Sequence, residues 1–434
     1  MAEFVIIGNG VAGVRAAETI RSHNSSGSIV MISEEEYPFY YRPLLPEYVA
    51  GLVEEERLWS KPKDFYIRHN IELALGRKAI KIDPAEKLVF LENGENIPYD
   101  ALLIATGGNP APVRCLGWDL EGVGHLKTLS DARKLREKVK DASVGVVIGA
   151  GILGLELIDT FVKCGLDIHY VLPGDNIWPA ILDEKASGLV ENYLRKIGVK
   201  VYKRAGIKQI NSEDNKVKKV LLANGETISC ELVGLGIGLQ PNIDMVRWSG
   251  LQVRGMIFVN RAMKTNIPNI FAAGDVALCY EIPGEAGRCL PRWRRAWKQG
   301  EVAGLNMVEI ETDYREIPIC AVSTKIAGTP LLCLGNPNPS EQSMKTLLGM
   351  DQNKGIYKKI VLRNHRIKGA LFITDLRGGG KVTQFMQQGT DITASEEISL
   401  QEIVKVEGSE TAILMVCPIC KMEISPAGCP ACGR

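Results

Sequence analysis

Residues 8–13 read Gly8-Asn9-Gly10-Val11-Ala12-Gly13, between an apolar stretch, 4–7, and a helical pattern, 14–21. This is GxGxxG in its required setting of buried strand, glycine turn and helix. The glycines permit a tight turn and let a pyrophosphate approach the helix N-terminus. Residues 28–32 predict the next strand. Glu34 follows it, about 20 residues past the last glycine, where a carboxylate can accept from ribose hydroxyls. The stretch predicts a dinucleotide-binding fold; a plain structural glycine turn is the alternative.

A second copy of this pattern starts at Gly149-Ala150-Gly151-Ile152-Leu153-Gly154, after the apolar strand 144–148. Two such units about 140 residues apart predict two nucleotide-binding folds, because chance rarely repeats a motif in its full context. The next strand, 167–172, ends in Leu172, where an NAD site usually has an acid. Asp175 is positioned to substitute from the loop, and we expect no arginine cluster for a 2′-phosphate at this strand end. NAD is favoured over NADP, and a degenerate fold that no longer binds nicotinamide is the alternative.

Composition places the chain among ordinary globular proteins. It has 434 residues, enough for two to four domains, with 45% hydrophobic and 24% charged residues and a formal net charge of +1. That charge gives no reason to expect nucleic acid or an anionic membrane as the main partner. The apolar start lacks a basic region, so we expect a first strand there rather than a signal peptide. Eleven cysteines, with the only dense cluster at the C-terminus, suit a reducing cytoplasm.

Three further motifs carry a family resemblance. They are Ala105-Thr106-Gly107-Gly108, Gly234-Leu235-Gly236-Ile237-Gly238-Leu239-Gln240-Pro241-Asn242, and Thr265-Asn266-Ile267-Pro268-Asn269-Ile270-Phe271-Ala272-Ala273-Gly274-Asp275. In this order they resemble the two-nucleotide-fold flavoproteins related to glutathione reductase. The resemblance implies bound FAD, a hydrogen bond from Asp275 to its ribityl chain, and an NAD fold inserted into the FAD fold.

The stretch Tyr37-Pro38-Phe39-Tyr40-Tyr41-Arg42-Pro43-Leu44-Leu45-Pro46-Glu47-Tyr48-Val49-Ala50-Gly51 narrows the subgroup. It resembles the flavin-proximal segment of NADH:rubredoxin oxidoreductases and of the flavin module of assimilatory nitrite reductases. The expected fold class is α/β, with an α+β interface domain and a small metal-binding tail. The expected domains are an FAD-binding domain at 1–110 and 245–310, an NAD(P)-binding domain at 111–244, an interface domain at 311–395, and a linker and tail at 396–434.

No cysteine precedes Cys115. Disulfide reductases of this family place a CxxxxC pair beside the flavin, and thiol-dependent NADH oxidases and peroxidases place a single cysteine there. Without a thiolate beside the flavin, electrons have no covalent sulfur relay. We therefore expect a path from nicotinamide through flavin to a one-electron acceptor.

The resemblance also implies roles around the flavin. Arg42 matches a basic position near the flavin, where a cation would stabilise negative charge; a surface arginine beside a proline turn is the alternative. Glu156 is the second catalytic candidate, facing the nicotinamide and pairing with Arg42; stabilisation of the helix N-terminus is its alternative. The stretch 292–295 (Arg, Trp, Arg, Arg) could dock an acidic carrier or be ordinary solvated charge.

Together these motifs predict two sets of cofactor-binding residues. Those expected around FAD are Gly8, Gly10, Val11, Ala12, Gly13, Glu34, Arg42, Pro43, Ala79, Ala105, Thr106, Gly107, Asp275, Ala296 and Trp297. Those expected around the nicotinamide nucleotide are Gly149, Gly151, Ile152, Leu153, Gly154, Asp175 and Gly236.

The chain ends in two cysteine knuckles, Cys417-Pro418-Ile419-Cys420 and Cys429-Pro430-Ala431-Cys432, with eight residues between them. Paired CxxC knuckles present four thiolates, a tetrahedral set of metal ligands. So short a segment cannot build a hydrophobic core, so metal would supply its folding energy. Zinc is the first choice, mononuclear iron or an iron–sulfur cluster the second, and free or disulfide-linked cysteines the third.

The leading hypothesis is an NADH-linked flavin reductase that exchanges electrons with an iron–sulfur carrier: rubredoxin, ferredoxin or a partner redox subunit. One rival is an NADH oxidase or peroxidase. Another is a flavin-carrying subunit of a multi-subunit redox complex. The direction of electron flow stays open, and so does assembly as a homodimer or heteromer. Because the sequence stops at residue 434, we expect no sirohaem catalytic half.

Overall fold

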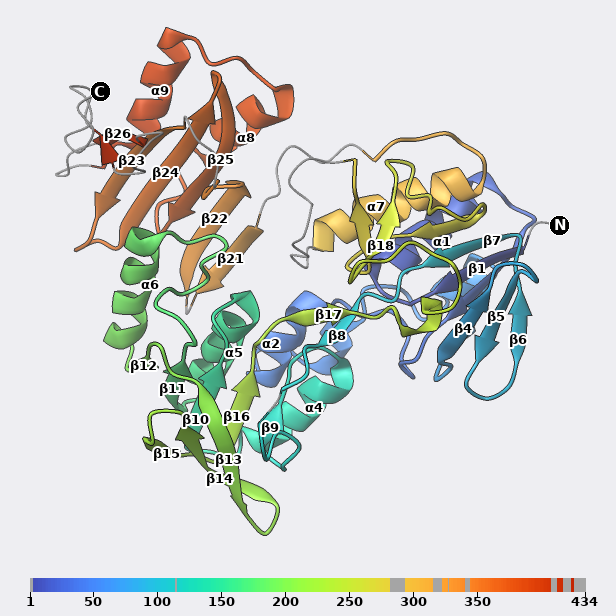
Figure 1. Cartoon of the computed structure of the whole chain (residues 1–434), viewed down its shortest axis with the longest axis horizontal. Helices are drawn as coiled ribbons and strands as arrows, with labels where there is room; N and C mark the ends of the chain where they lie inside the picture. The colour runs from blue at the N-terminus through green and yellow to red at the C-terminus, as the bar shows by residue number, and fades with distance from the viewer. Residues whose placement is uncertain are drawn as a thin grey trace. The chain divides into compact units, whose positions relative to one another are not determined.

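The computed structural model describes residues 3–113, 115–281, 293–314, 322–326, 328–339, 344–406, 412–416 and 423–424. The chain divides into two compact units (Figure 1). The first unit comprises residues 1–45, 53–111 and 239–316, and the second comprises 46–52, 112–238 and 317–434. The FAD-fold motifs all fall in the first unit and the second glycine motif falls in the second.

A parallel sheet forms the centre of the first unit. Its described strands run in the order β19-β7-β1-β2-β3, and β1 pairs in parallel with both β2 and β7. The strands are nearly continuous in buried apolar residues, as expected of a sheet covered on both faces. Their bounds are β1 Glu3–Ile7, β2 Ser28–Ile32, β3 Ile71–Ala74, β7 Ala101–Ile104 and β19 Ile270–Ala272.

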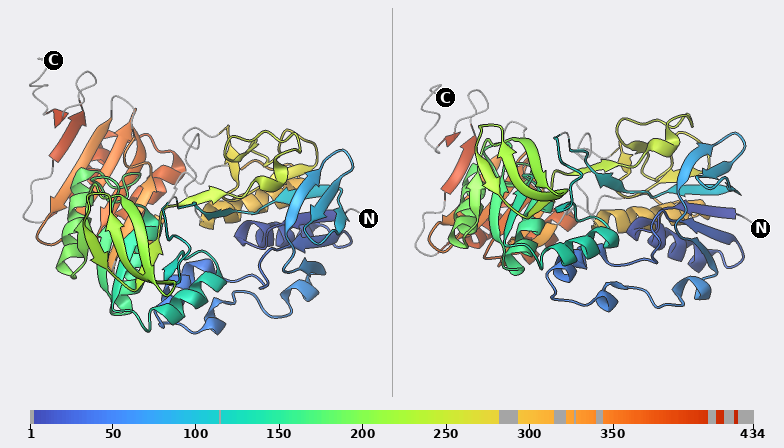
Figure 2. Two further views of the ribbon diagram at one scale, coloured as in Figure 1. Left: turned by 60° about the horizontal axis from the view of Figure 1, so that its bottom comes forward. Right: turned by 90° about the horizontal axis from the view of Figure 1, so that it is seen from below.

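Two helices, α1 (Val11–His23) and α7 (Trp293–Met307), lie side by side in the first unit (Figures 1 and 2). Small residues allow this close approach. A Cβ atom at Gly300 would lie 2.2 Å from the carbonyl oxygen of Ala12, and one at Gly304 would lie 2.8 Å from that of Ala16. The packing fixes α7 against the helix that follows the first glycine turn.

Smaller elements complete the first unit. The antiparallel sheet is β4 (Ala79–Asp83), β5 (Leu88–Leu91) and β6 (Asn96–Pro98). The two-stranded pairs are β8 (Gly108–Pro110) with β17 (Leu239–Pro241), and β18 (Ile257–Val259) with β20 (Ala277–Cys279). The short helices are η1 (Arg42–Leu44), η2 (Glu55–Leu58), α3 (Phe65–Arg68) and η3 (Asp244–Val246).

The second unit repeats the nucleotide fold. Its described parallel sheet has the order β12-β11-β10-β16-β9, and an antiparallel sheet β13-β14-β15 accompanies it. The strand bounds are β9 Val123–Gly124, β10 Val144–Ile148, β11 Asp167–Val171, β12 Lys200–Tyr202, β13 Ile207–Glu213, β14 Lys216–Leu222, β15 Thr227–Ser229 and β16 Leu232–Leu235. The helices are α2 (Leu45–Val49, which begins at the unit boundary), α4 (Leu129–Lys138), α5 (Ile152–Lys163) and α6 (Glu184–Lys196).

A larger sheet, also in the second unit, follows in the order β21-β22-β25-β24-β23-β26-β27. Its bounds are β21 Val322–Ile326, β22 Thr329–Gly335, β23 Lys345–Asp351, β24 Ile356–Arg363, β25 Arg366–Ile373, β26 Ala412–Val416 and β27 Glu423–Ile424. Helices α8 (Gly379–Gln388) and α9 (Ala394–Val404) contribute Val382, Leu400 and Val404 to its core. The sheet thus includes two strands, β26 and β27, that lie beyond the predicted domain boundary at residue 395.

Asp183 connects this sheet to the nucleotide fold of the same unit. It caps α6 by accepting a hydrogen bond of 2.9 Å from the backbone N–H of Ala186. Its other oxygen accepts from the Tyr357 hydroxyl at 2.5 Å and from Lys359 Nζ at 2.8 Å. One carboxylate therefore satisfies a helix end and two side chains of β24.

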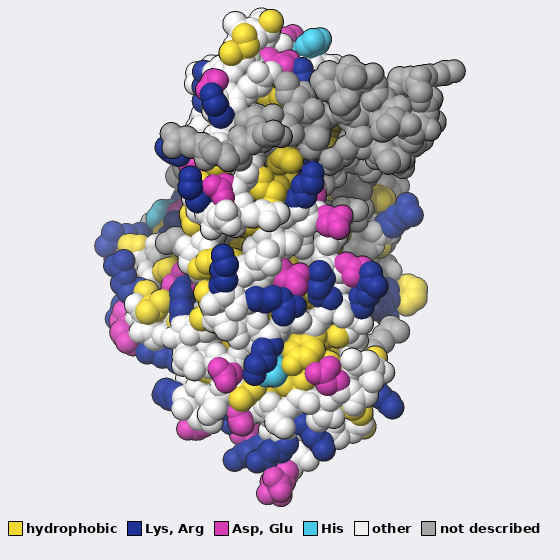
Figure 3. All heavy atoms as spheres, turned by 90° about the vertical axis from the view of Figure 1, so that its left-hand side faces the viewer, with side chains coloured by type: hydrophobic (Ala, Val, Ile, Leu, Met, Phe, Trp, Pro, Cys, Tyr) yellow, Lys and Arg dark blue, Asp and Glu magenta, His cyan; other side chains and the backbone are white. Residues whose placement is uncertain are grey.

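Charged side chains of both signs are interspersed on the face shown in Figure 3. No helix in the described part of the chain is long and apolar enough to cross a membrane.

Candidate cofactor sites

The three glycines of the first turn have different surroundings. Gly8 has φ +116°, and a Cβ there would lie 2.3 Å from the carbonyl oxygen of Ala105. A Cβ at Gly13 would lie 2.0 Å from the carbonyl oxygen of Gly8. A Cβ at Gly10, the N-cap of α1, would meet no heavy atom of the described residues within 4 Å. Two of the glycines therefore allow close backbone packing. The third faces open space at a helix N-terminus, where a pyrophosphate can bind. We call this glycine turn with its helix N-terminus a cradle.

The second turn repeats this arrangement. Gly149 has φ +129° and packs against Gly236, whose carbonyl oxygen would lie 2.2 Å from an added Cβ. A Cβ at Gly154 would lie 2.3 Å from the carbonyl oxygen of Gly149. Gly151, at the N-cap of α5, again has no heavy atom of the described residues within 4 Å of an added Cβ. The same cradle thus exists in each unit.

The turn after β7 and the turn after β19 border the first cradle. Thr106 Oγ1 donates a 2.8 Å hydrogen bond to the carbonyl oxygen of Asn242. The N–H of Gly274, next to Asp275, donates to Gln299 Oε1 at 2.9 Å. Gln299 is fully buried, and its Nε2 has no hydrogen-bond partner in the described chain. Sequence reasoning missed this unsatisfied donor, although Gln299 stands only two residues past the predicted FAD residue Trp297.

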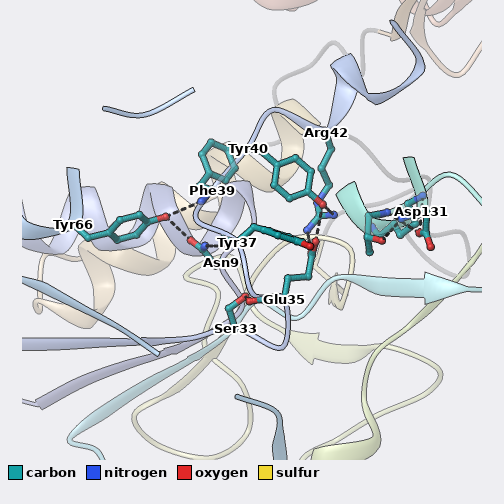
Figure 4. A network of polar contacts seen from close by, with 11 residues as sticks. Asn9, Ser33, Glu35, Tyr37, Phe39, Tyr40, Arg42, Tyr66 and Asp131 are labelled. Atoms are coloured by element: carbon teal, nitrogen blue, oxygen red, sulfur yellow. Dashed lines mark hydrogen bonds and ion pairs between the residues drawn. The ribbon is translucent and has the colours of Figure 1, made fainter. Parts of the chain in front are cut away.

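Arg42 lies in a network with Glu35 and Tyr40 (Figure 4). It forms an ion pair with Glu35, donates to the Tyr40 hydroxyl at 2.5 Å, and lies over the Tyr40 ring at 4.8 Å. The Tyr40 hydroxyl donates to the second oxygen of Glu35 at 2.7 Å. Arg42 is therefore more than a surface arginine beside Pro43. The network uses Glu35, whereas the predicted ribose ligand Glu34 is exposed and pairs with Lys78 at 3.3 Å.

Asn9, between the first two glycines, is fixed by Tyr66. The Tyr66 hydroxyl donates to Asn9 Oδ1 at 2.8 Å and accepts from the N–H of Phe39 at 3.0 Å (Figure 4). Asn9 Nδ2 donates to the carbonyl oxygen of Tyr37 at 3.3 Å. Burial raises the pKa of Tyr66, so it stays a hydroxyl donor. The glycine turn is thus tied to the Tyr37–Gly51 stretch, a link that the motif itself does not reveal.

The remaining predicted FAD residues are placed as follows. Ala79 begins β4 and is buried in the core of the first unit. Ala296 is buried in α7, and Trp297 lies under the guanidinium of Arg15 at 4.2 Å. The interpretation of 292–295 as a solvent-facing patch is wrong for Arg295, which is buried and donates to the carbonyl oxygen of Ala277 at 3.1 Å.

Glu156 lies among acids of its own unit. Burial is the largest cause that raises its pKa to about 7, followed by the charges of Glu47 and Asp159. One oxygen of Glu47, Oε2, is itself buried and accepts no hydrogen bond from described residues. Glu156 is the fifth residue of α5 and lies outside its first turn, so stabilisation of the helix N-terminus does not account for it. The predicted pair of Arg42 with Glu156 joins the two units and stays a prediction.

Asp175 follows β11 and pairs with Arg204, which follows β12, at 2.6 Å. Lys203 is next to it in the chain. The sequence shows no arginine cluster after β11 itself, but the structure brings a single arginine, Arg204, to this strand end. The cause is topological, because β12 is the parallel neighbour of β11 and ends at the same edge of the sheet. In the sequence, Lys203-Arg204 directly follows β12, a strand that the sequence analysis did not predict.

The four predicted metal ligands, Cys417, Cys420, Cys429 and Cys432, lie outside the described residues. Within the described part, no group of three or more His, Cys, Asp or Glu side chains could hold a metal ion.

Two known protein families match this chain, one over its first 300 residues and one over the sheet that follows. Residues 2–300 match the pyridine nucleotide-disulphide oxidoreductase family, and residues 323–390 match the rubredoxin NAD+ reductase C-terminal domain.

Individual relatives agree with this. A nitrite reductase [NAD(P)H] of Bacillus subtilis is 31% identical over 407 residues, 93% of this chain, but the chain spans only 49% of that protein. Rhodocoxin reductase of Rhodococcus erythropolis is 34% identical over 72% of this chain and 74% of its own. The crystal structure of NADH:rubredoxin oxidoreductase from Clostridium acetobutylicum superposes with a TM-score of 0.74 at 26% identity, covering 92% of this chain and 99% of that one. The chain belongs to the pyridine nucleotide-disulphide oxidoreductase family.

Proposed function

We propose that this protein passes electrons between a nicotinamide nucleotide and a one-electron iron–sulfur carrier, such as rubredoxin, ferredoxin or a partner redox subunit. The observation that carries the proposal is the pair of glycine cradles, each with one glycine facing open space, in a chain with no cysteine before Cys115. The names of two relatives, a rhodocoxin reductase and an NADH:rubredoxin oxidoreductase, support this acceptor class.

In the first unit, the N-terminus of α1 and Gly10 would hold the FAD pyrophosphate. Bound FAD supplies hydride acceptance from nicotinamide and release of single electrons. Glu34, exposed two residues past β2, would accept from the ribose hydroxyls, because both carboxylate oxygens of its neighbour Glu35 are already held by Arg42 and Tyr40. Asp275 would bind the ribityl chain, and the unsatisfied Nε2 of Gln299 offers a further donor beside it.

In the second unit, Gly151 and the N-terminus of α5 would hold the nicotinamide nucleotide pyrophosphate. Glu156, about one turn further along α5, is the acid closest in sequence to this cradle. We assign it the role of positioning the nicotinamide end. With a pKa of about 7 it can hold a proton under neutral conditions.

Stopped-flow mixing tests the proposal. NADH or NADPH should bleach the visible flavin band of the purified protein, because the cradle of the second unit would hold the hydride donor and that of the first unit the FAD that accepts the hydride. Rubredoxin or ferredoxin added afterwards should restore the band faster than oxygen does. Absence of bleaching with both nucleotides would contradict the free-standing reductase. Faster reoxidation by oxygen than by any carrier would favour the oxidase.

We further propose that the four-cysteine tail binds zinc. Cys417 and Cys420 lie in the connection 417–422 between β26 and β27, which pair antiparallel. Two CxxC pairs supply four thiolates, the ligand set of a tetrahedral structural zinc site. Metal analysis should give about one zinc per chain. Cys417→Ser with Cys429→Ser should remove it while FAD content is unchanged, since no described FAD-fold residue belongs to the tail. Visible iron bands, or no metal in a reduced preparation, would overturn the zinc assignment.

A further inference from the structure

In the second unit, the adenosine ribose of a bound nicotinamide nucleotide would lie where β11 ends, and the residues there differ from those usual in an NAD site. β11 and β12 are parallel neighbours, with Val171 opposite Tyr202, so the chain leaves both strands at the same edge. The two following loops are joined by backbone hydrogen bonds: Ala205 N–H to the Leu172 carbonyl at 2.8 Å, and Arg204 N–H to the Gly174 carbonyl at 3.1 Å. The residues after β12 therefore lie beside the loop that carries Asp175.

The residue that follows β11, Leu172, contributes no polar side chain there. Leu172 is fully buried, so its side chain cannot meet a ribose hydroxyl or a phosphate. The polar chemistry comes from Asp175 and Arg204, whose side chains are 52% and 78% exposed. Lys203 stands beside them, 37% exposed, with its Nζ 2.9 Å from Glu191. Glu191 also holds Arg195, so Lys203 is not its sole partner.

The two members of the exposed pair suit two different ligands. In parallel nucleotide folds, a carboxylate past the second strand accepts from the 2′-hydroxyl of NAD, and an arginine in this region binds the 2′-phosphate of NADP. Arg204 keeps Asp175 ionised by lowering its pKa, so the carboxylate remains an acceptor. An exposed ion pair contributes little to stability, so a ligand can separate Asp175 from Arg204 and bind one of them at little cost.

We propose that Asp175 and Arg204 form a two-way ribose subsite, in which Asp175 accepts from the 2′-hydroxyl of NADH and Arg204, with Lys203, binds the 2′-phosphate of NADPH. This inference rests on the proposed nicotinamide site in the second unit. It replaces the preference for NAD with dual specificity. Arginine suits the phosphate because its guanidinium makes two parallel charge-assisted hydrogen bonds.

Binding of nucleotide fragments tests the subsite without turnover. Calorimetry on the FAD-loaded protein would compare adenosine 2′,5′-bisphosphate with 5′-AMP, which lacks the 2′-phosphate. Arg204→Gln should weaken the bisphosphate about 10- to 100-fold more than it weakens 5′-AMP. Asp175→Asn should shift the preference the opposite way, toward the bisphosphate, because it removes a negative charge beside the phosphate. Lys218→Gln is the matched control, since Lys218 forms a comparably exposed pair with Glu213 at 3.4 Å in the same unit.

The ratio of kcat/KM for NADPH to that for NADH should move in parallel with the fragment affinities. Equal weakening of both fragments by Arg204→Gln, or a shift of the same size in Lys218→Gln, would overturn the subsite. If the fragments bind as expected but neither dinucleotide reduces the flavin, the proposed reductase function fails and the ribose subsite stands.

Discussion

Replacement of Gly151 by alanine is expected to give a folded protein that keeps FAD but is reduced by NADH and NADPH about 100-fold less efficiently. Gly151 has φ −91° and ψ −173°, which alanine adopts without strain. Its added Cβ meets no described protein atom within 4 Å, so the fold has no reason to respond. The methyl group would instead stand where the pyrophosphate approaches the N-terminus of α5. Stopped-flow reduction and the flavin spectrum measure the two properties separately.

Three other glycines act as references for this substitution. Gly154→Ala places a Cβ 2.3 Å from a backbone oxygen, so it should destabilise the second unit itself. Gly188→Ala, in the interior of α6 with no described atom within 4 Å, should leave reduction unchanged and raise stability modestly, because alanine is favoured over glycine in a helix. Gly10→Ala should lose FAD, because its open space lies in the first cradle. Reduction of the Gly151→Ala protein at the wild-type rate would show that dinucleotide does not bind at this turn.

The α/β fold predicted from the two glycine motifs is confirmed for the described units, because those motifs are local. A strand, a turn and the start of a helix stand next to one another in the chain, so spacing alone indicates their arrangement. The absence of any cysteine before Cys115 is likewise read directly from the sequence.

Residues that come together from distant segments could not be found this way. Arg204 reaches Asp175 only because β12 lies beside β11 in the sheet order. Tyr66 fixes Asn9 across 57 residues of sequence. That Glu35, and not Glu34, pairs with Arg42 depends on which side chain turns toward it, and the spacing of the motif does not reveal this.

Glu156 should make the stability of the protein fall as the pH rises from about 5 to 8. Its folded-state pKa is about 7, above its ordinary value of 4.5, so the folded state binds the proton more tightly. The stabilisation is fully present below 4.5 and is lost as the pH rises through 7. The difference corresponds to at most about 3 kcal/mol, at roughly 1.4 kcal/mol for each tenfold change in proton affinity. Glutamine resembles the protonated form, so Glu156→Gln should match the wild type at pH 5 and exceed its stability at pH 8.

The groups around Glu156 sharpen this test. Asp159 is paired with Lys163 at 2.6 Å, whereas Glu47 has a buried oxygen without a partner in the described chain. The short helix that carries Glu47, α2, is held by Cys164, whose Sγ donates to the Val49 carbonyl oxygen at 3.8 Å. Glu47→Gln should therefore remove repulsion, lower the pKa of Glu156 and move the stability loss to lower pH. Urea unfolding at several pH values measures the effect for each variant. Parallel pH profiles for the wild type and Glu156→Gln would show that another group carries the proton, because glutamine cannot titrate.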